Sequence, residues 1–290
     1  YKGEVVCSAM SELITSGLQY VRPTKELRST LSEPNIEYRD GSVTVAGTTL
    51  RLETVFTAML QHPNHASKDC ILRHYDKDIL GNSLIEAGEA DATVIMPLAD
   101  LGSYEVDGTH PDWDTLSTSD KQYGVAMAAG GNNRYGRIDP FLQGVNAVAE
   151  NVRNIAAVGA VPRALSDCLN YGNPEIPEQL FALEQGIAGI AEAAKNIIVE
   201  GECVPVISGN VSLYNATKDG SIDPTANVCV FGILRNAKKS ISMKLQSPNS
   251  HLLLLGERKS ELGGCAYYQI LEECTKAPWN SLLGANVPRP

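Results

Sequence analysis

Two polar stretches of this sequence carry the residue types that hold phosphates and metals in proteins. Residues 166–174 read SDCLNYGNP, and residues 208–215 read SGNVSLYN. Each follows or overlaps a short apolar run that predicts a buried strand. Because ligands of open α/β sheets sit beyond the carboxyl ends of strands, we expect both stretches to form ligand-binding loops.

The second stretch places three complementary groups close together. Gly209 lets backbone N–H groups approach a ligand, Asn210 offers a hard carbonyl oxygen suited to Mg²⁺, and Ser212 can donate to a phosphate. A turn in which Asn and Ser cap their own backbone explains the same residues, and composition alone favours that turn. In the first stretch, Asp167 suits Mg²⁺ or a ribose hydroxyl, and equally well a helix cap or a turn.

A third candidate is a helix that the sequence predicts to begin at Asp139 and Pro140. Asn146, Glu150 and Asn154 follow at i, i+4 spacing, so they share one face. Together with Asp139 they suit a metal–nucleotide. The simpler interpretation, which is stronger here, makes Asp139 the N-cap and the stripe a solvated face.

The fourth candidate is the polar segment 62–68, which reads HPNHASK. Lys68 suits a phosphate contact as a point charge, although a surface lysine is the commoner outcome. His62 and His65 lack a cysteine or carboxylate that would complete a metal set, so both are interpreted as surface residues.

Composition excludes several classes of function. The 290 residues carry 24 Lys and Arg against 34 Asp and Glu, a net charge of −10. Such a chain is poorly suited to a nucleic-acid backbone, and it must bind small phosphates through backbone amides or a bridging metal. No apolar run approaches the roughly 20 residues that span a bilayer. Seven cysteines without a C-x-x-C pair predict reduced thiols and a cytoplasmic location, and no P-loop motif occurs.

Helical and strand patterns alternate along the chain, which indicates a layered α/β fold. Asp40 and Gly41 predict a turn before a strand at 42–45, and residues 1–6 resemble half of a hairpin. Residues 1–49 show no compact core, and the polar segment 236–249 is the best domain boundary. The further predicted elements are strands at 163–167, 203–207, 225–234 and 251–255 and helices beginning near 140, 177 and 265.

Four collinear segments give the sequence a family resemblance. Residues 166–175 and 208–215 resemble two signatures of phosphoribosylformylglycinamidine synthase, residues 147–154 (AVAENVRN) a third, and residues 62–68 with 73–76 and 81–82 a fourth. The resemblance runs from about residue 60 to residue 268.

The resemblance implies a particular domain organisation. The family's synthetase polypeptide resembles two tandem aminoimidazole-ribonucleotide (AIR) synthetase-like copies, each with two α/β domains. The chain is therefore expected to be an internal fragment with unnatural ends. Residues 1–49 would be a tail and linker, residues 50–236 the N-terminal domain of the second copy with a mixed sheet and packed helices, and residues 237–290 the start of a truncated C-terminal domain.

The implied reaction joins ATP, formylglycinamide ribonucleotide and ammonia derived from glutamine. Phosphorylation turns the amide oxygen into a leaving group, so catalysis rests on positioning and on Mg²⁺. By motif, Asp167, Gly209 and Lys68 would contact ATP, Asn210 would bind Mg²⁺ and Ser212 the substrate. An auxiliary Mg-nucleotide would take Asp139, Glu150 and Asn154. The implied partners are a glutaminase subunit or domain and a small accessory subunit.

The sequence also departs from the family. Gly130 stands where family members carry an acidic residue, and the family's catalytic histidine belongs to the first copy, so the chain by itself should not turn over. Two alternatives remain open. One is another ATP enzyme of the same superfamily, such as AIR synthetase, selenophosphate synthetase or thiamine-monophosphate kinase. The other is a non-catalytic nucleotide-binding scaffold.

Overall fold

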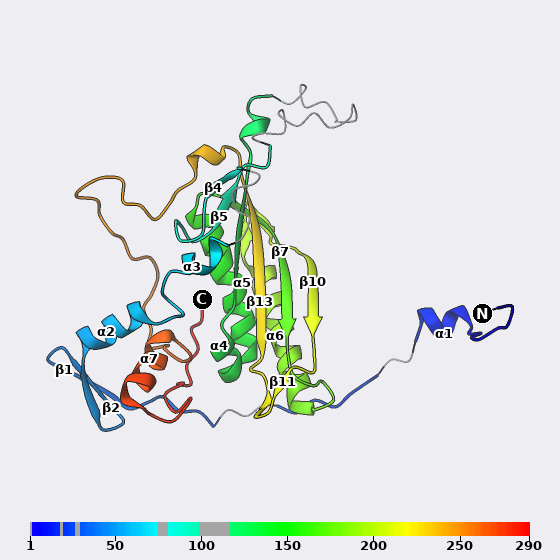
Figure 1. The fold of residues 1–290 in the computed structure, drawn as a ribbon, viewed down its shortest axis with the longest axis horizontal. Helices are drawn as coiled ribbons and strands as arrows, with labels where there is room; N and C mark the ends of the chain where they lie inside the picture. Colours follow the sequence, from blue (N-terminus) through cyan, green and yellow to red (C-terminus); the bar gives the residue numbers. More distant parts are fainter. Residues whose placement is uncertain (1, 18–19, 27–29, 75–80, 99–116) are drawn as a thin grey trace.

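The computed structural model describes residues 2–17, 20–26, 30–74, 81–98 and 117–290. Its centre is a six-stranded sheet in the order β10-β7-β13-β6-β5-β4 (Figure 1). Only the β10–β7 pair is parallel, and the other four pairs are antiparallel. This mixed sheet with packed helices confirms the predicted α/β fold class. The strands are β4 (Ser83–Ile85), β5 (Thr93–Ile95), β6 (Gly124–Gly130), β7 (Val161–Asn170), β10 (Val206–Ser212) and β13 (Thr225–Leu234).

Two long helices, α5 (Pro140–Ala157) and α6 (Pro177–Asn196), form the layer on one side of this sheet. The strands alternate, so Leu165, Val228 and Val230 point into the helix layer and are fully buried. The carboxylate of Asp139 caps α5 by accepting from the Leu142 N–H at 2.9 Å, as predicted. The opposite face of the sheet carries the half-exposed residues of each strand.

Glycines allow the two helices to approach backbone to backbone. A Cβ on Gly189 would lie 2.0 Å from the Phe141 carbonyl oxygen, and one on Gly144 would lie 2.3 Å from that of Gly186. A larger residue at these points would force the helices apart. The contact therefore fixes how α6 covers α5 and, through it, the sheet.

A second, smaller core joins segments from the two ends of the chain. Here β1 (Ile36–Arg39), β2 (Ser42–Val45) and β3 (Thr48–Arg51) form an antiparallel sheet beside α2 (Leu52–Gln61) and α7 (Ala266–Thr275) (Figure 1). The buried side chains of this core come from β2, α2, α7 and the segment that follows α7. They are Val43, Val45, Val55, Tyr268, Ile270, Leu271 and Leu282.

The β1–β2 turn follows its sequence signal. Asp40 and Gly41 both adopt positive φ, 47° and 72°, which suits a two-residue hairpin turn and a glycine in second place. The expectation that residues 1–49 lack a core was wrong, since Val43 and Val45 are buried against α7. This core could not be predicted from residues 1–49, because α7, which packs against β2, lies more than 200 residues further along the chain. The domain boundaries remain a prediction.

The remaining elements are short. Figure 1 shows α1, which buries no side chain, standing apart from the rest of the molecule. They are α1 (Ser11–Thr15), α3 (Asp69–Leu72), η3 (Asp120–Gln122), α4 (Asn133–Ile138), β8 (Ile198–Val199), β9 (Glu202–Cys203), β11 (Ala216–Thr217), β12 (Gly220–Ser221) and η4 (Ala237–Lys239).

Several local predictions need correction. Residues 251–255 form no strand and their leucines are exposed, and residues 2–6 form no hairpin arm. The apolar run 203–207 is divided between β9 and β10. More importantly, residues 166–170 and 208–212 were predicted as loops but belong to strands. Their polar side chains masked the strand pattern because one face of this sheet is open.

Candidate functional site

The two polar stretches meet as neighbouring parallel strands. In the β7–β10 register Gly209 pairs with Asp167, Asn210 with Cys168, and Ser212 with Asn170. A Cβ on Gly209 would lie 2.6 Å from Asp167 Oδ2 and 2.7 Å from Oδ1. Only glycine fits this position without displacing the carboxylate.

Asp167 lies on the face of the sheet that the helices cover. It shares this face with the buried Leu165 and Leu169, and partial burial raises its pKa above the ordinary value. The nearby Tyr171 is fully buried, and its hydroxyl has no hydrogen-bond partner among the described residues. Burial, together with the negative charge of Asp167, raises the pKa of Tyr171.

Asn210 and Ser212 lie on the opposite, open face, because side chains alternate along a strand. All of β10 except Ser212 is exposed. Asn215 supports the end of this strand, since its amide donates to the Ser212 carbonyl oxygen at 2.9 Å and to the Tyr171 carbonyl oxygen at 3.1 Å. Asp167 and Asn210 are thus neighbours in the sheet, but they cannot contact the same atom of a ligand.

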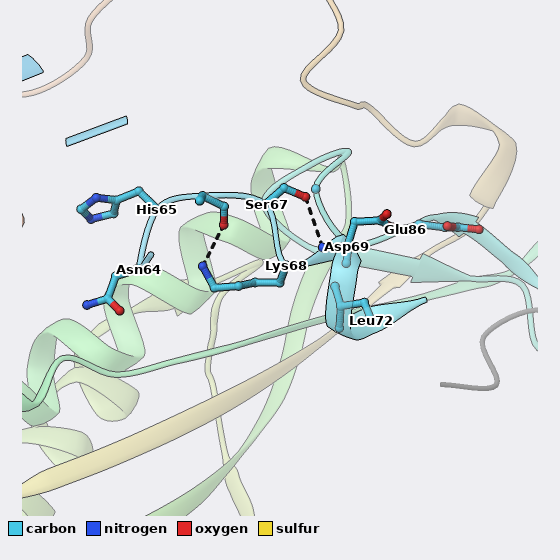
Figure 2. A pocket seen from close by; sticks show the side chains of 10 residues that line it. Asn64, His65, Ser67, Lys68, Asp69, Leu72 and Glu86 are labelled. Atoms are coloured by element: carbon cyan, nitrogen blue, oxygen red, sulfur yellow. Dashed lines mark hydrogen bonds between the residues drawn. The ribbon is translucent and has the colours of Figure 1, made fainter. Parts of the chain in front are cut away.

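Lys68 lies away from these residues. It lines a cavity of about 540 Å³ together with residues 64–67, 69, 72 and 86–88 (Figure 2). That cavity adjoins β4, the strand at the opposite edge of the sheet from β10. The Lys68 ammonium donates to the Ala66 carbonyl oxygen at 2.8 Å and to that of Pro63, so it holds its own loop together. The structure does not bring Lys68 to Asp167 and Gly209.

Two residues expected to bind an auxiliary Mg-nucleotide, Asp139 and Glu150, also lie far from each other. Asp139 precedes the first turn of α5, eleven residues before Glu150, and at 1.5 Å per residue they lie roughly 16 Å apart along the helix. One metal ion cannot bind both. Glu150 instead neighbours Gly130, where a Cβ would lie 3.8 Å from Glu150 Oε1. A side chain at position 130 would therefore stand beside Glu150 and Asn151.

Asn146, the other polar residue of the α5 stripe, is buried rather than solvated. Its amide donates to the Leu142 and Pro288 carbonyl oxygens at 2.8 and 2.7 Å. This side chain fastens the C-terminal segment to α5.

The described residues contain no group of three or more His, Cys, Asp or Glu that could hold a metal ion. Within the same ranges, no helix is long and apolar enough to cross a bilayer. All seven cysteines are free thiols. Tyr75 and Asp76, part of one resemblance segment, lie outside the described residues. Any Mg²⁺ held by Asn210 would need further ligands from the nucleotide or from elsewhere in the protein.

Sequence reasoning missed the neighbours that complete the open face. Cys168 and Asn170 lie between β10 and β13, with Asn227 opposite Cys168 and Thr225 opposite Asn170. All of these side chains are polar and none is charged. Alternation within 166–170 was the available signal, but it becomes visible only once the segment is known to be a strand.

The fold and the similarity to known proteins together define the class of protein. Residues 112–234 match the family model described as AIR synthase related protein, N-terminal domain. The structure of PurLQS from Thermotoga maritima has a TM-score of 0.53 over 84% of this chain and 32% of that chain, at 20% identity. T. maritima PurL complexed with ATP has a TM-score of 0.50 over 83% and 31%, also at 20% identity. At this identity the two structures show a shared fold.

A closer relative identifies the family. The phosphoribosylformylglycinamidine synthase subunit PurL of Methanothrix thermoacetophila is 35% identical over 291 residues, which cover 99% of this chain and 33% of that protein. The chain belongs to the phosphoribosylformylglycinamidine synthase family and corresponds to part of the subunit PurL. It spans about a third of the length of the curated relative.

Proposed function

We propose that this chain is the nucleotide- and magnesium-binding half of an ATP-dependent amidine-forming ligase of purine biosynthesis. The substrate is formylglycinamide ribonucleotide, and ammonia released from glutamine by a glutaminase subunit or domain is the second reactant. A single observation carries the proposal: Gly209 and Asn210 pair in register with Asp167 and Cys168 on adjacent parallel strands. Relatives named PurL and the ATP complex of T. maritima PurL support it.

The chemistry requires a leaving group at an amide carbon. ATP phosphorylates the amide oxygen of the substrate, ammonia attacks the carbon, and phosphate departs to leave the amidine and ADP. The protein contributes positioning and neutralisation of phosphate charge. In this scheme the Gly209 backbone contacts ATP, Asn210 binds Mg²⁺, and Ser212 contacts the ribonucleotide. Asp167 lies on the other face of the sheet, so its expected contact with ATP requires a rearrangement of this edge.

The polar end of the open face suits the binding roles proposed for these residues. Its side chains at Asn210, Ser212, Asn170 and Asn227 are uncharged, so phosphate charge must be balanced by Mg²⁺. The face is half of a site and needs a second surface. We propose that the first AIR synthetase-like copy supplies it together with the catalytic residues, and that residues 50–236 are the N-terminal domain of the second copy.

Further features of the scheme concern the rest of the protein. Lys68 contributes to ATP binding only if the loop of residues 62–68 reorganises, because its ammonium is engaged within that loop. An auxiliary Mg-nucleotide would rest on Glu150 and Asn154, with Asp139 confined to capping the helix. A small accessory subunit and a cytoplasmic location complete the proposal.

Steady-state turnover of the full-length protein tests this function. Asn210→Ala should lower ATP-dependent amidine formation by about a hundredfold, the loss expected for a ligand of catalytic Mg²⁺. Asn196→Ala on the outer helix should leave the rate unchanged. A variant at position 210 that loses nucleotide-dependent stability while retaining nearly full turnover would instead support the scaffold. Amidine formation by the isolated 290 residues would contradict the assignment of catalysis to the first copy.

A further inference from the structure

Three side chains form a row across the open face of the sheet. Asn210 on β10 pairs with Cys168 on β7, and Cys168 pairs with Asn227 on β13. Paired residues on one face have Cβ atoms about 5 Å apart, so Asn210 and Asn227 stand roughly 10 Å apart with Cys168 between them. The row links the proposed Mg²⁺ ligand to a residue two strands away.

Asn227 has unused hydrogen-bonding capacity. Its side chain is exposed and makes no hydrogen bond with any other described residue. In contrast, the amide of Asn170 on the next strand donates to the Cys168 carbonyl oxygen at 3.1 Å. Asparagine is also disfavoured in strands, and the other outward residues of β13 beyond it are Cys229, Phe231 and Ile233. An amide in this position needs an explanation other than strand formation.

The backbone beside Asn227 limits where its amide can go. A Cβ on Gly131 would lie 2.7 Å from Asn227 Oδ1 and 2.4 Å from the Ala226 carbonyl oxygen. Gly131 therefore leaves just enough room for the amide at the end of β6. Cys168, the residue between the two amides, is small and half-buried. It therefore leaves room for a ligand to lie over it and reach both amides.

We propose that Asn227 is a further binding residue of the Mg-nucleotide site, and that the nucleotide held at Asn210 crosses Cys168 to reach it. The inference rests on the proposed function. The Asn227 amide nitrogen donates to a phosphate or ribose oxygen, and its carbonyl oxygen accepts from a ribose hydroxyl or a metal-bound water. Because the amide is neutral, it adds hydrogen bonds without requiring a counter-charge.

Calorimetric titration of the full-length protein with Mg·ADP tests the inference. Asn227→Ala should weaken binding about tenfold, the loss expected for one or two hydrogen bonds to a charged ligand. Asn196→Ala, which removes an amide from the outer helix, should bind as the unmodified protein does. In a second measurement, Mg·ADP should slow alkylation of Cys168 by iodoacetamide, quantified on the isolated peptide, and in Asn227→Ala the same protection should require about tenfold more Mg·ADP.

The outcomes separate this inference from the function on which it rests. If Asn227→Ala binds normally while Asn210→Ala does not, Asn227 is not a binding residue and the proposed function stands. If neither variant changes binding, both ideas fail. If Asn227→Ala lowers the melting temperature, Asn227→Asp decides: its charge should weaken binding at low Mg²⁺ and excess Mg²⁺ should restore it. Equal affinity at all Mg²⁺ concentrations would overturn the inference.

Discussion

The carboxylate of Asp167 rests against the Cα of Gly209 on the adjacent parallel strand, leaving no space for a side chain at position 209. This contact couples two segments that the sequence separates by a long helix. Because the carboxylate is partly buried, its position depends on the glycine as much as on its own strand. The pair is therefore both a packing constraint and a feature of the proposed nucleotide site.

The first prediction concerns this contact. Gly209→Ala should destabilise the protein by about 1–3 kcal/mol, because the added methyl group overlaps the Asp167 carboxylate. Mg·ADP binding should weaken in the same variant. Urea titration and calorimetry measure the two effects.

A double-mutant cycle provides the control. Asp167→Ala removes the atoms that the new methyl group would meet, so the double variant should recover at least about 1 kcal/mol of the loss. Additive effects of the two substitutions would mean that the clash is not the cause.

The second prediction concerns pH. Burial raises the pKa of Asp167 above 3.8, so the folded protein binds this proton more tightly than the unfolded chain does. The resulting stabilisation is complete below pH 3.8 and is lost as the pH rises through the folded-state pKa. Without nucleotide, Asp167→Asn should therefore exceed the unmodified protein in stability at pH 7. The difference should vanish near pH ~3. Denaturant midpoints measured across this range check the sign, and a constant difference would refute it.

The third prediction concerns a buried arginine. Arg134 is 9% exposed, and its guanidinium nitrogens Nε, Nη1 and Nη2 have no hydrogen-bond partner among the described residues. Burial lowers its pKa, and the negative charge of Glu272 opposes that effect. Arg134→Met should leave the protein as stable or up to about 3 kcal/mol more stable, because the cost of burying this charge disappears while the Glu272 carboxylate keeps two backbone N–H donors.

Substitution of Glu272, the negative charge near Arg134, should have the opposite effect on stability. Its buried carboxylate accepts from the Asn280 and Leu282 N–H groups at 2.7 and 3.0 Å. Glu272→Gln should destabilise by about 3 kcal/mol, since it leaves Arg134 without this neighbouring charge. Combining it with Arg134→Met should restore most of that loss. A double variant no more stable than Glu272→Gln would show that the two charges are independent.

The fourth prediction concerns the contact between Tyr171 and Gly186 of α6. The Tyr171 hydroxyl is buried without a hydrogen-bond partner in the described part of the chain, so Tyr171→Phe should be neutral or stabilising by about 1 kcal/mol. Gly186→Ala should be destabilising by about 1–3 kcal/mol, because its methyl group would lie 1.9 Å from that hydroxyl oxygen. Thermal unfolding separates the two outcomes. A clear loss of stability in Tyr171→Phe would reveal a partner, such as a buried water, for the hydroxyl.

Elements with local signals could be predicted from the sequence. The aspartate and proline at residues 139 and 140 began α5, the pair Asp40 and Gly41 formed the hairpin turn, and apolar periodicity predicted α6 and β13. These features depend on a few neighbouring residues, so the pattern was sufficient. The family resemblance identified which polar residues to examine.

Which of those residues lie together is visible only in the folded protein. Register placed Gly209 against Asp167, alternation turned Asn210 to the other face, and the strand order put Lys68 at the far edge. Folding also packs Val43 against α7, which is distant in sequence, and places Asn227 in the same row as Asn210. Register and strand order are set by contacts between distant segments, and no single stretch of sequence records them.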